Sequence, residues 1–393
     1  MNLFHIALEK LRAENLLREI ITPDGPCDKY VMVKGKSLLN LCSNNYLGLA
    51  KHSSLQESAK QAIETYGTGT GGARLLSGAS PLHIALEEKV KAFRPFQLTS
   101  SSSKALLFNT GYMANLGAIQ SLGSIFKAIY SDKANHASLH DGLRLLTIPF
   151  ERYKHNDLNH LEKLLEKQTE PELSLVCSET LFSMDGDFAD LKGLLDLQKR
   201  FGFYLYLDEA HSTGCYRNLV EPFMQSCPEK LILMGTFGKA FGSFGAYIIA
   251  SPEIIDYFIN FNRPFIFSTS LPPAVLAANI AAIDLVLKEP ERSEKLKNLA
   301  QFALNKAKEL GLQTGLSQSH ILPIILGSNE RAVKAAEMLR DLGYFTLPVR
   351  YPTVPKGTAR LRINLSSEWE IQEIDAMLGA VKSVVEVLDQ QNV

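Results

Sequence analysis

One lysine, Lys239, lies in a loop of glycines and phenylalanines that directly follows a strand-like apolar run at residues 230–233. Apolar neighbours disfavour the ammonium form, which lowers the pKa of a lysine and makes its free amine available as a nucleophile or base. A lysine that forms a Schiff base with a carbonyl compound needs this property. The surrounding glycines let the backbone turn tightly and approach a flat ligand closely. The stretch therefore indicates covalent chemistry on a lysine amine.

Three other interpretations of this stretch compete. A phosphate-binding P-loop needs Gly-x-x-x-x-Gly-Lys-Ser/Thr, but Ala240 follows the lysine and Leu233 occupies the place of the first glycine. A membrane-spanning helix over residues 231–250 would carry a central lysine at a cost of about 3 kcal/mol, and its glycines would weaken it further. The remaining alternative is a glycine-rich turn with an incidental lysine, which only the rest of the chain can test.

From Lys104 onward, strand-like runs alternate with helix-like segments. This alternation predicts a mainly parallel, doubly wound sheet with helices on both faces. The expected strands are Ala105–Phe108, Ala128–Ser131, Leu145–Phe150, Leu173–Ser178, Phe203–Leu207, Leu231–Met234 and Gly245–Ala250. The helices expected between them include Tyr112–Leu122, Leu158–Glu166 and Leu191–Phe201.

Polar residues gather where these strands end. Ligands on doubly wound sheets bind beyond the carboxyl ends of the strands, so this placement predicts an active site. Taken alone, each histidine among them is more often a hydrogen-bonded structural residue. The residues at the strand ends are Gly111, His136, Ser183, Asp208, His211, Thr236 and Lys239.

An aromatic aldehyde cofactor such as pyridoxal phosphate (PLP) needs such a set. Lys239 would form the Schiff base, and Asp208 would keep the pyridine nitrogen protonated so that the ring acts as an electron sink. His136 would lie flat over the ring. The phosphate would bind where Gly111 and Tyr112 open a helix directly after a strand. Further donors to the ring or the phosphate would come from Ser183, Thr236 and His211.

Three other stretches give weaker signals. The polar turn Ser43–Gly48 contains Asn44 and Asn45, which could simply cap it. Residues 67–72 match Gly-x-Gly-x-x-Gly, but they follow a helix-like segment rather than a strand. We therefore reject a dinucleotide site there and expect a flexible active-site loop. The serine run Ser100–Ser103 is expected to be a surface loop.

The pattern changes after residue 252 to a separate α/β lobe, which an amphipathic helix over residues 1–20 is expected to join. Helices are expected over 273–288, 293–310 and 331–342, with a last helix from about residue 368. Strands are expected over 30–33, 37–41, 321–326, 345–349 and 360–365.

Arg360 and Arg362 alternate along one of these strands and therefore face the same side. One interpretation is a pair of solvated arginines on an open sheet face. The other is a guanidinium aimed at a substrate carboxylate, which its planar fork binds in two places.

Composition narrows the class of protein. The chain has 393 residues, so it can hold more than one domain, and its net charge of −1 gives no general attraction to nucleic acid or anionic membranes. Five scattered cysteines without Cys-x-x-Cys spacing argue for a reducing, cytoplasmic location and against a disulfide framework or a metal site. Glutamates interrupt the apolar residues of the N-terminus, so no signal peptide is expected.

Motifs over almost the whole chain resemble those of the α-oxoamine synthases, a family of fold type I PLP enzymes. The matching segments are Ser43–Leu49, Asn135–Ser138, Phe182–Asp187, Leu207–Gly214, Thr236–Gly242, Phe267–Ser270 and Tyr351–Arg362. The resemblance implies a large domain with a mainly parallel seven-stranded sheet and a smaller α/β C-terminal domain. We expect residues 1–45 to pack with the small domain or a partner, residues 46–270 to form the large PLP-binding domain, and residues 271–393 to form the small domain.

The resemblance also assigns roles to single residues. Lys239 would hold PLP and act as acid and base at the substrate Cα. Asn44 and Arg362 would hold the carboxylate of the amino acid, and Arg18 and Thr353 would contact the acyl substrate. The implied catalytic set is Lys239, His136, Asp208 and His211. The implied cofactor contacts are Gly111, Tyr112, His136, Ser183, Asp208, His211, Thr236 and Lys239.

Members of this family join an amino acid to an acyl thioester with loss of CO2. Residues 267–273 and 352–362 most resemble the members that condense L-alanine with pimeloyl-CoA, or with pimeloyl-acyl carrier protein, in biotin synthesis. A homodimer with shared active sites is implied. Rivals within the family join other pairs, such as glycine with acetyl-CoA, or form 5-aminolevulinate. A rival from another class is a PLP-binding partner subunit without catalysis, and the presence of Lys239 counts against it.

Two features depart from the family pattern. Trp369 stands where many members have histidine, and the loop before Ser103 is longer than usual. Each could alter the acyl channel or only the surface.

Overall fold

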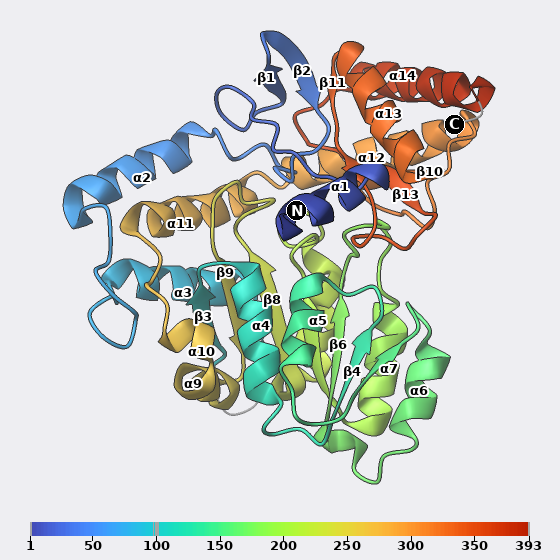
Figure 1. Ribbon diagram of the computed structural model, residues 1–393. Coiled ribbons are helices and arrows are strands. Elements are labelled where there is room, and N and C mark those ends of the chain that lie inside the picture. The colour runs from blue at the N-terminus through green and yellow to red at the C-terminus, as the bar shows by residue number, and fades with distance from the viewer. Residues whose placement is uncertain (1, 97, 99–101, 392–393) are drawn as a thin grey trace. The chain divides into compact units, whose positions relative to one another are not determined.

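The computed structural model describes residues 2–96, 98 and 102–391, and contacts divide the chain into two compact units. Unit 1 comprises Met1–Lys51, Ser183–Asp187 and Glu291–Val393, and unit 2 comprises His52–Phe182 and Phe188–Pro290. Figure 1 traces the chain through these segments by colour. The helix α11 (Pro273–Lys288) packs against α2 (Ser53–Tyr66) and α3 (Pro81–Phe93), so it belongs to unit 2. The large unit therefore extends to Pro290, whereas the sequence analysis expected the large domain to end at residue 270.

Unit 2 is built on a seven-stranded sheet with the order β3-β9-β8-β7-β6-β4-β5. The strands from β8 to β5 pair in parallel, whereas β9 runs antiparallel to β3 and to β8. The mainly parallel sheet predicted from the sequence is thus confirmed. The strands are β3 (Lys104–Phe108), β4 (Ala128–Asp132), β5 (Phe150–Tyr153), β6 (Ser174–Glu179), β7 (Tyr204–Asp208), β8 (Leu231–Thr236) and β9 (Ala246–Ala250).

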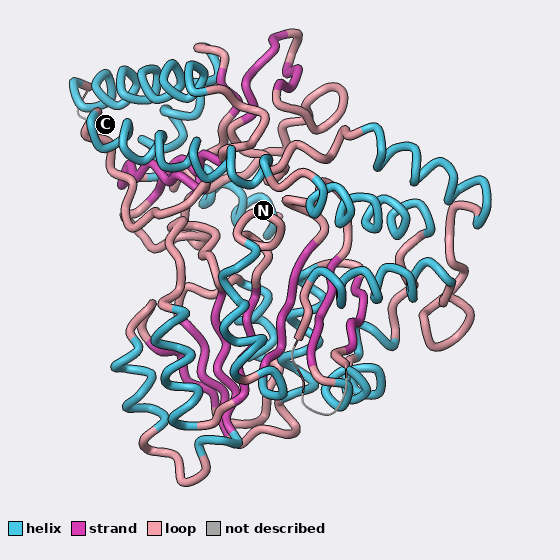
Figure 2. Tube along the Cα trace, turned by 180° about the vertical axis from the view of Figure 1, so that it is seen from behind, coloured by secondary structure: helices cyan, strands magenta, loops and turns pink. Residues whose placement is uncertain are grey.

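Helices cover both faces of this sheet (Figure 2). Every residue of β4, β6, β8 and β9 is buried, which requires cover on each side. On one face, Ile119, Leu139 and Phe258 pack on Ile129 and Ile232. Besides α2, α3 and α11, the helices are α4 (Gly111–Leu122), α5 (Ala137–Arg144), α6 (Leu158–Leu165), α7 (Leu191–Phe201), α8 (Glu221–Ser226), α9 (Pro252–Phe261) and α10 (Arg263–Ile266), with short 3-10 turns at Pro171–Leu173, Arg217–Val220 and Pro228–Lys230.

Two helices begin immediately after strand ends and are capped by side chains. Thr110 Oγ1 accepts a hydrogen bond of 3.1 Å from Met113 N at the start of α4. His136 Nδ1 accepts one of 3.3 Å from Ser138 N at the start of α5. These caps fix where each helix begins, and they therefore place Gly111 and His136 at the carboxyl edge of the sheet.

Unit 1 contains two three-stranded sheets, β1-β2-β11 and β10-β13-β12. Its strands are β1 (Tyr30–Val33), β2 (Lys36–Asn40), β10 (Ile321–Gly327), β11 (Tyr344–Phe345), β12 (Pro348–Val349) and β13 (Ala359–Asn364). Its helices are α1 (Leu3–Ala13), α12 (Glu291–Glu309), α13 (Asn329–Asp341) and α14 (Ile371–Gln390). A small core of Val31, Val33, Leu38 and Phe345 ties N-terminal to C-terminal residues within this unit.

Several sequence predictions were wrong in their bounds. The apolar run 145–150 is mainly a turn, and the strand is the more polar edge segment β5, because Leu146 and Ile148 pack on the core from outside the sheet. The run 345–349 is divided between β11 and β12, which pair with different strands. The first helix ends at Ala13, because Asn15 takes a left-handed φ of 54°.

Two other expectations concern loops and membranes. Residues 100 and 101 of the serine run lie outside the described residues, while Ser102 is exposed and Ser103 is buried. No helix in the described part of the chain is long and apolar enough to span a membrane. Residues 231–250, once considered as such a span, form β8, a loop and β9.

His83 supplies a prediction about stability. It stands at the third position of α3, where its Nδ1 accepts a hydrogen bond of 3.1 Å from Ser80 N, and burial together with the charge of Arg74 lowers the pKa of His83 from 6.5 to about 4. Between these values the unfolded chain binds the proton and the folded chain does not, so stability is lost as pH falls. His83→Gln keeps the capping box without titrating.

We expect urea denaturation of His83→Gln to show a smaller loss of stability than the wild type between about pH 6.5 and about pH 4, by about 1 kcal/mol or more. The exposed variant His5→Gln should behave as the wild type does. Equal pH dependence of wild type and His83→Gln would contradict the assignment.

Candidate active site

A cavity of about 170 Å³ lies at the carboxyl edge of the unit 2 sheet, where β7 and β8 end. It collects all of the predicted cofactor contacts except Ser183, which clusters with unit 1. It also adds Asn115 and Glu179, which the sequence analysis did not select. The lining residues are Gly111, Tyr112, Asn115, His136, Glu179, Asp208, Ala210, His211, Met234, Thr236 and Lys239.

The loop between β8 and β9 holds Lys239 in this cavity. Phe237 and Phe241 are fully buried and anchor the loop, while Lys239 itself is half-buried. Thr236 Oγ1 accepts from Gly238 N at 3.1 Å and donates to the carbonyl of residue 245 at 2.9 Å, which closes the turn. The Nζ atom of Lys239 lies 2.7 Å from Nε2 of His211. An incidental surface lysine would not be placed in this way.

Asp208 ends β7 and is 4% exposed. Its two carboxylate oxygens accept hydrogen bonds of 2.8 Å from Asn115 Nδ2 and from Ala210 N, and neither donor carries a charge. The next residue, Glu209, is fixed by a buried two-point ion pair with Arg94, at 3.0 and 2.7 Å. This pair anchors the turn that presents Asp208 to the cavity.

His136 borders the cavity from the loop after β4. Burial lowers its pKa below the usual value; the charge of Asp208 opposes this effect and that of Lys239 adds to it. Its Nδ1 accepts from the backbone of Ser138 and lies 2.8 Å from Ser138 Oγ. The ring of Tyr112 meets it edge-on, with 6.4 Å between ring centres. The neutral imidazole is therefore the favoured form of His136.

Glu179 is a residue that the sequence analysis missed. It ends β6 directly beside Asp208 in the parallel register, and its Oε1 accepts from His136 N. Burial, and next the charge of Asp208, raise the pKa of Glu179 well above its usual value. The signal was present in the sequence, because Glu179 follows an apolar strand just as Asp208 does.

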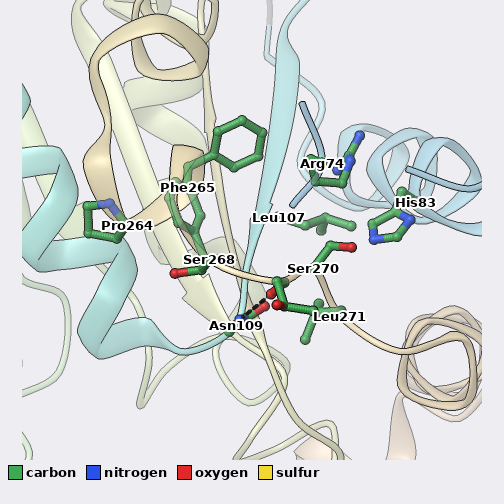
Figure 3. Close-up of a pocket in the computed structure, with 11 residues that line it drawn as sticks. Arg74, His83, Leu107, Asn109, Pro264, Phe265, Ser268, Ser270 and Leu271 are labelled. Atoms are coloured by element: carbon green, nitrogen blue, oxygen red, sulfur yellow. Dashed lines mark hydrogen bonds between the residues drawn. The ribbon is translucent and has the colours of Figure 1, made fainter. Parts of the chain in front are cut away.

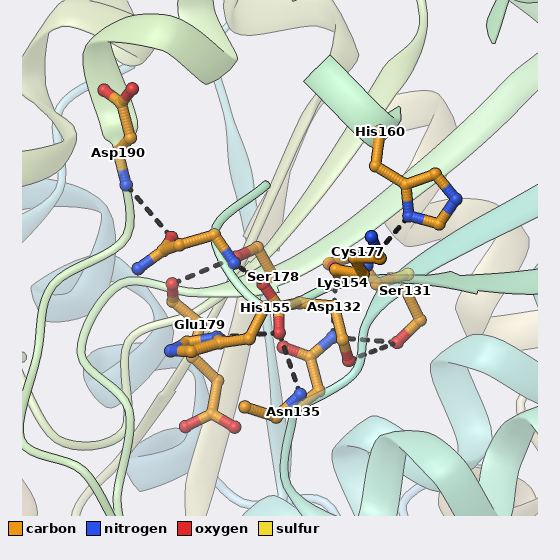
Figure 4. Close-up of polar contacts among 12 residues, drawn as sticks. Ser131, Asp132, Asn135, Lys154, His155, His160, Cys177, Ser178, Glu179 and Asp190 are labelled. Atoms are coloured by element: carbon orange, nitrogen blue, oxygen red, sulfur yellow. Dashed lines mark hydrogen bonds and ion pairs between the residues drawn. The ribbon is translucent and has the colours of Figure 1, made fainter. Parts of the chain in front are cut away.

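A buried acidic centre supports the loop that carries His136 (Figure 4). Asp132, at the end of β4, accepts from Ala134 N at 2.8 Å and from Asn156 N at 2.9 Å, and it lies 2.9 Å from His155 Nδ1. Asn135 donates to Ser131 Oγ at 2.8 Å and to the carbonyl of residue 177 at 2.9 Å. These contacts fix the backbone on which the position of His136 depends.

In unit 1, Asn44 and Arg362, which the resemblance assigns to one ligand, are in contact. Arg362 Nη1 donates to Asn44 Oδ1 at 3.2 Å, and its Nη2 donates to Tyr46 Oη at 3.3 Å. Asn364 Nδ2 also donates to Asn44 Oδ1, at 3.2 Å. The polar turn is thus organised around one amide oxygen with several donors.

Arg360 and Arg362 do face the same side of β13, but Arg360 is buried and Arg362 is only partly exposed. Arg360 is 3% exposed and donates to Asp185 at 2.7 Å and to the carbonyl of Met184 at 3.0 Å. Arg362 Nε donates to the carbonyl of Ser183 at 2.6 Å. The interpretation as an open sheet face was therefore wrong, and these contacts explain why residues 183–187 belong to unit 1.

The remaining predicted positions are placed as follows. Arg18 and Thr353 are exposed in unit 1, and Arg18 lies in a segment without regular structure after α1. Arg350 donates to the carbonyls of Asn15 and Leu17, the latter at 3.2 Å, which holds that segment. Trp369 is 1% exposed, so its indole is part of the interior of unit 1 and not of its surface.

A second, smaller cavity in unit 2 offers less chemistry (Figure 3). It lies where Ala73 bridges to Thr269, beside the glycine-rich stretch at 67–72. Its Arg74 forms a two-point ion pair with Glu87, at 2.8 and 3.3 Å. The Lys239 cavity is accordingly the candidate active site.

The contacts of Arg360 lead to a prediction about residues 183–187. Arg360→Gln removes the charged donor to Asp185, so amide hydrogen exchange in this segment should accelerate about tenfold or more. Mass-spectrometric exchange on the intact protein measures this. The control variant Lys297→Gln, at a partly exposed lysine of α12, should leave the segment unchanged. Unaltered exchange in Arg360→Gln would show that other contacts hold it.

Comparison with known proteins places the chain among relatives. The aminotransferase class I and II family model matches residues 36–381. An 8-amino-7-oxononanoate synthase from Geobacter sulfurreducens is 41% identical over 384 residues, covering 96% of each chain. Another, from Citrifermentans bemidjiense, is 42% identical over 394 residues, covering 98% of each chain.

Solved structures give the same fold. Serine palmitoyltransferase from S. paucimobilis, with a bound PLP–myriocin aldimine, has a TM-score of 0.88 at 27% identity and covers 98% of this chain and 97% of that one. An 8-amino-7-oxononanoate synthase from Francisella tularensis has a TM-score of 0.75 at 26% identity and covers 89% of this chain and 98% of that one. The fold is that of the fold type I PLP transferases, as the sequence predicted.

Proposed function

The chain belongs to the aminotransferase class I and II family, and on that premise we propose that it is a PLP-dependent acyltransferase that condenses L-alanine with a pimeloyl thioester. This is the reaction of an 8-amino-7-oxononanoate synthase in biotin synthesis. The observation that carries the proposal is the single cavity in which Lys239, His211, Asp208 and His136 meet. Identity of 41–42% over nearly the full length of relatives with that name supports these substrates.

The residues of the cavity fit PLP. Asp208 is a buried carboxylate with two uncharged donors, and a protonated pyridine nitrogen would supply the missing positive charge. The first N–H groups of α4, at Gly111 and Tyr112, lack acceptors within the helix and suit a phosphate. The neutral ring of His136 suits a flat aromatic neighbour. Bound there, PLP supplies an electron sink for charge that develops at the substrate Cα.

The protein's own groups then move protons and orient the substrate. Lys239 takes the proton from the Cα of alanine and later returns one, and His211 at 2.7 Å from its Nζ holds the amine in position. The Cα attacks the thioester carbonyl, the thiol leaves, and the alanine carboxylate departs as CO2. Burial, and next the charge of Asp208, raise the pKa of Glu179 well above its usual value, which disfavours a second negative charge beside Asp208.

Unit 1 supplies the groups that we assign to substrate recognition. Arg362 and Asn44 form a donor-rich cluster suited to the carboxylate of the amino acid. Arg18 and Thr353 are exposed and are assigned to the acyl substrate. We further propose a cytoplasmic homodimer with shared active sites. The five free cysteines are consistent with a reducing compartment.

A second candidate is condensation of L-serine with a longer acyl thioester. The similarity to serine palmitoyltransferase, with its TM-score of 0.88, favours it. That relative is 27% identical, whereas the 8-amino-7-oxononanoate synthases are 41–42% identical. Glycine with acetyl-CoA, or formation of 5-aminolevulinate, remains a further rival within the same chemistry.

Thiol release decides among these substrates. We expect PLP-loaded protein to release CoA from pimeloyl-CoA with L-alanine at least about tenfold faster than with glycine or L-serine, since a mismatched side chain or acyl chain loses about 1–3 kcal/mol of transition-state binding. Mass spectrometry should identify 8-amino-7-oxononanoate. Release only with serine, with glycine or with another acyl-CoA would overturn the alanine–pimeloyl assignment but leave the reaction class intact.

Lys239→Ala tests the cofactor itself. The wild type should acquire visible absorption on adding PLP, because the Lys239 amine condenses with the aldehyde, and the variant should lack that band and lose at least about a thousandfold in activity. Lys297→Ala, at a partly exposed lysine that forms an ion pair with Glu294, is the matched control. A wild type that stays colourless with added PLP would sink the proposed function.

A further inference from the structure

Two buried side chains outside the assigned catalytic set, Asn115 and Ser138, link Asp208 to His136, and a third, Tyr206, supports Asn115. Tyr206, Asn115 and Ser138 are each at most 1% exposed. Tyr206 Oη donates to Asn115 Oδ1 at 2.7 Å. Asn115 Nδ2 donates to Asp208 Oδ2 at 2.8 Å and to Ser138 Oγ at 2.9 Å, and Ser138 Oγ lies 2.8 Å from His136 Nδ1. The chain of contacts runs from the end of one strand, across α4, to the start of α5.

The chemistry of these groups fixes the direction of every hydrogen bond. Turning the Asn115 amide over would put its oxygen 2.8 Å from the Asp208 carboxylate, where two acceptors repel. Both amide hydrogens are therefore used, one on Asp208 and one on Ser138. His136 Nδ1 accepts from Ser138 N at 3.3 Å and so carries no hydrogen, and the Ser138 hydroxyl, which accepts from Asn115 and lies 2.8 Å from Nδ1, is placed to donate to it as well. The Nδ1 atom is then an acceptor, and the ring hydrogen of a neutral His136 is on Nε2.

We propose that Asn115 is a positioning residue that sets the tautomer of His136 while it orients the carboxylate of Asp208. Protonation of His136 would place a hydrogen on Nδ1, facing the hydroxyl of Ser138. Nδ1 could then no longer accept from Ser138 N, so α5 would lose its N-terminal cap. The charged groups around the ring are Asp208, Lys239 and Asp141, and Glu179 contacts its backbone N–H. Asn115 acts on His136 through Ser138 and not through a charge of its own.

The significance of this arrangement rests on the proposed function. A neutral imidazole can stack on a ring whose pyridine nitrogen is protonated, whereas an imidazolium would place two cations face to face. The Asn115 amide therefore acts on both residues that would contact the cofactor ring. It orients the Asp208 carboxylate, which would pair with the pyridine nitrogen, and it favours the uncharged form of His136, which would stack on the ring.

Asn115→Leu is the decisive variant, because it keeps a similar volume and removes both amide donors without adding a charge. Without the amide donor, the Ser138 hydroxyl is free to turn and to accept a hydrogen from His136 Nδ1. We expect the protonation midpoint of His136 to rise by about one pH unit, a tenfold change in its proton affinity. The Nε2–H pattern of the wild type should weaken at about pH 7. The measurement is nitrogen-15 NMR of histidine-labelled protein without cofactor, with His136→Gln for assignment.

Ser138→Ala provides a second route if Asn115→Leu fails to fold. It removes the hydroxyl but keeps the backbone donor, so a smaller shift in the same direction is expected. Ser121→Ala is the matched control, because this buried hydroxyl on α4 donates only to the carbonyls of Gly117 and Ala118 in the described contacts. It should leave the His136 signals unchanged.

An Nδ1–H tautomer in the wild type would overturn the proposal. So would unchanged His136 signals in every folded variant of Asn115 and Ser138. PLP titration of the same samples should show about tenfold weaker binding for Asn115→Leu, since the Asp208 carboxylate loses its donor. If the wild type binds no PLP but shows the Nε2–H pattern, the proposed function fails while the positioning role stands.

Discussion

The buried carboxylate of Asp208 is the constraint on which the arrangement of unit 2 depends. A charge removed from water is costly unless hydrogen bonds and an opposite charge compensate for it. Here Asn115 and a backbone N–H supply the hydrogen bonds, and the adjoining Arg94–Glu209 pair holds the turn in place. The parallel strands β6, β7 and β8 bring Glu179, Asp208 and Thr236 to one edge. The hydrogen bonds to Asp208 come from uncharged donors, so the cavity beside it suits a ligand with a positive centre.

The loop of Lys239 shows how a glycine-rich backbone is held in one conformation. Its glycines would give a mobile turn if nothing held them, but Phe237 and Phe241 are buried and Thr236 closes the turn with two hydrogen bonds. The amine therefore has a fixed position next to His211 while it remains half-buried. Conformational freedom in the backbone and anchoring by aromatic side chains together make a positioned nucleophile, which neither feature would give alone.

In unit 1, arginine side chains hold short segments in place by donating hydrogen bonds to their backbone carbonyls. Arg360 and Arg362 hold residues 183–185, and Arg350 holds the segment that carries Arg18. A guanidinium has five donors in a fixed plane, so it can bind a carbonyl and still present hydrogens to a ligand. The groups assigned to the substrate are thus built on the same interactions that shape the unit.

The sequence alone determined the parallel sheet and the cluster of polar residues at its strand ends, Lys239 among them, because these depend on local periodicity and on the order of residues along the chain. The family resemblance, and not a local pattern, grouped Asn44 with Arg362. Only the tertiary structure decided that Asn115 and Glu179 belong to the site, since Asn115 is one of many polar helix residues until Asp208 and Ser138 are seen around it. The prediction of a strand at 145–150 was wrong because apolar residues in a turn can also pack on the core, as Leu146 and Ile148 do. The strand at the sheet edge, β5, is more polar because one side of it is not covered. The sequence likewise left undecided whether Trp369 affects the acyl channel or only the surface. Its burial depends on packing between distant segments, which no local pattern encodes.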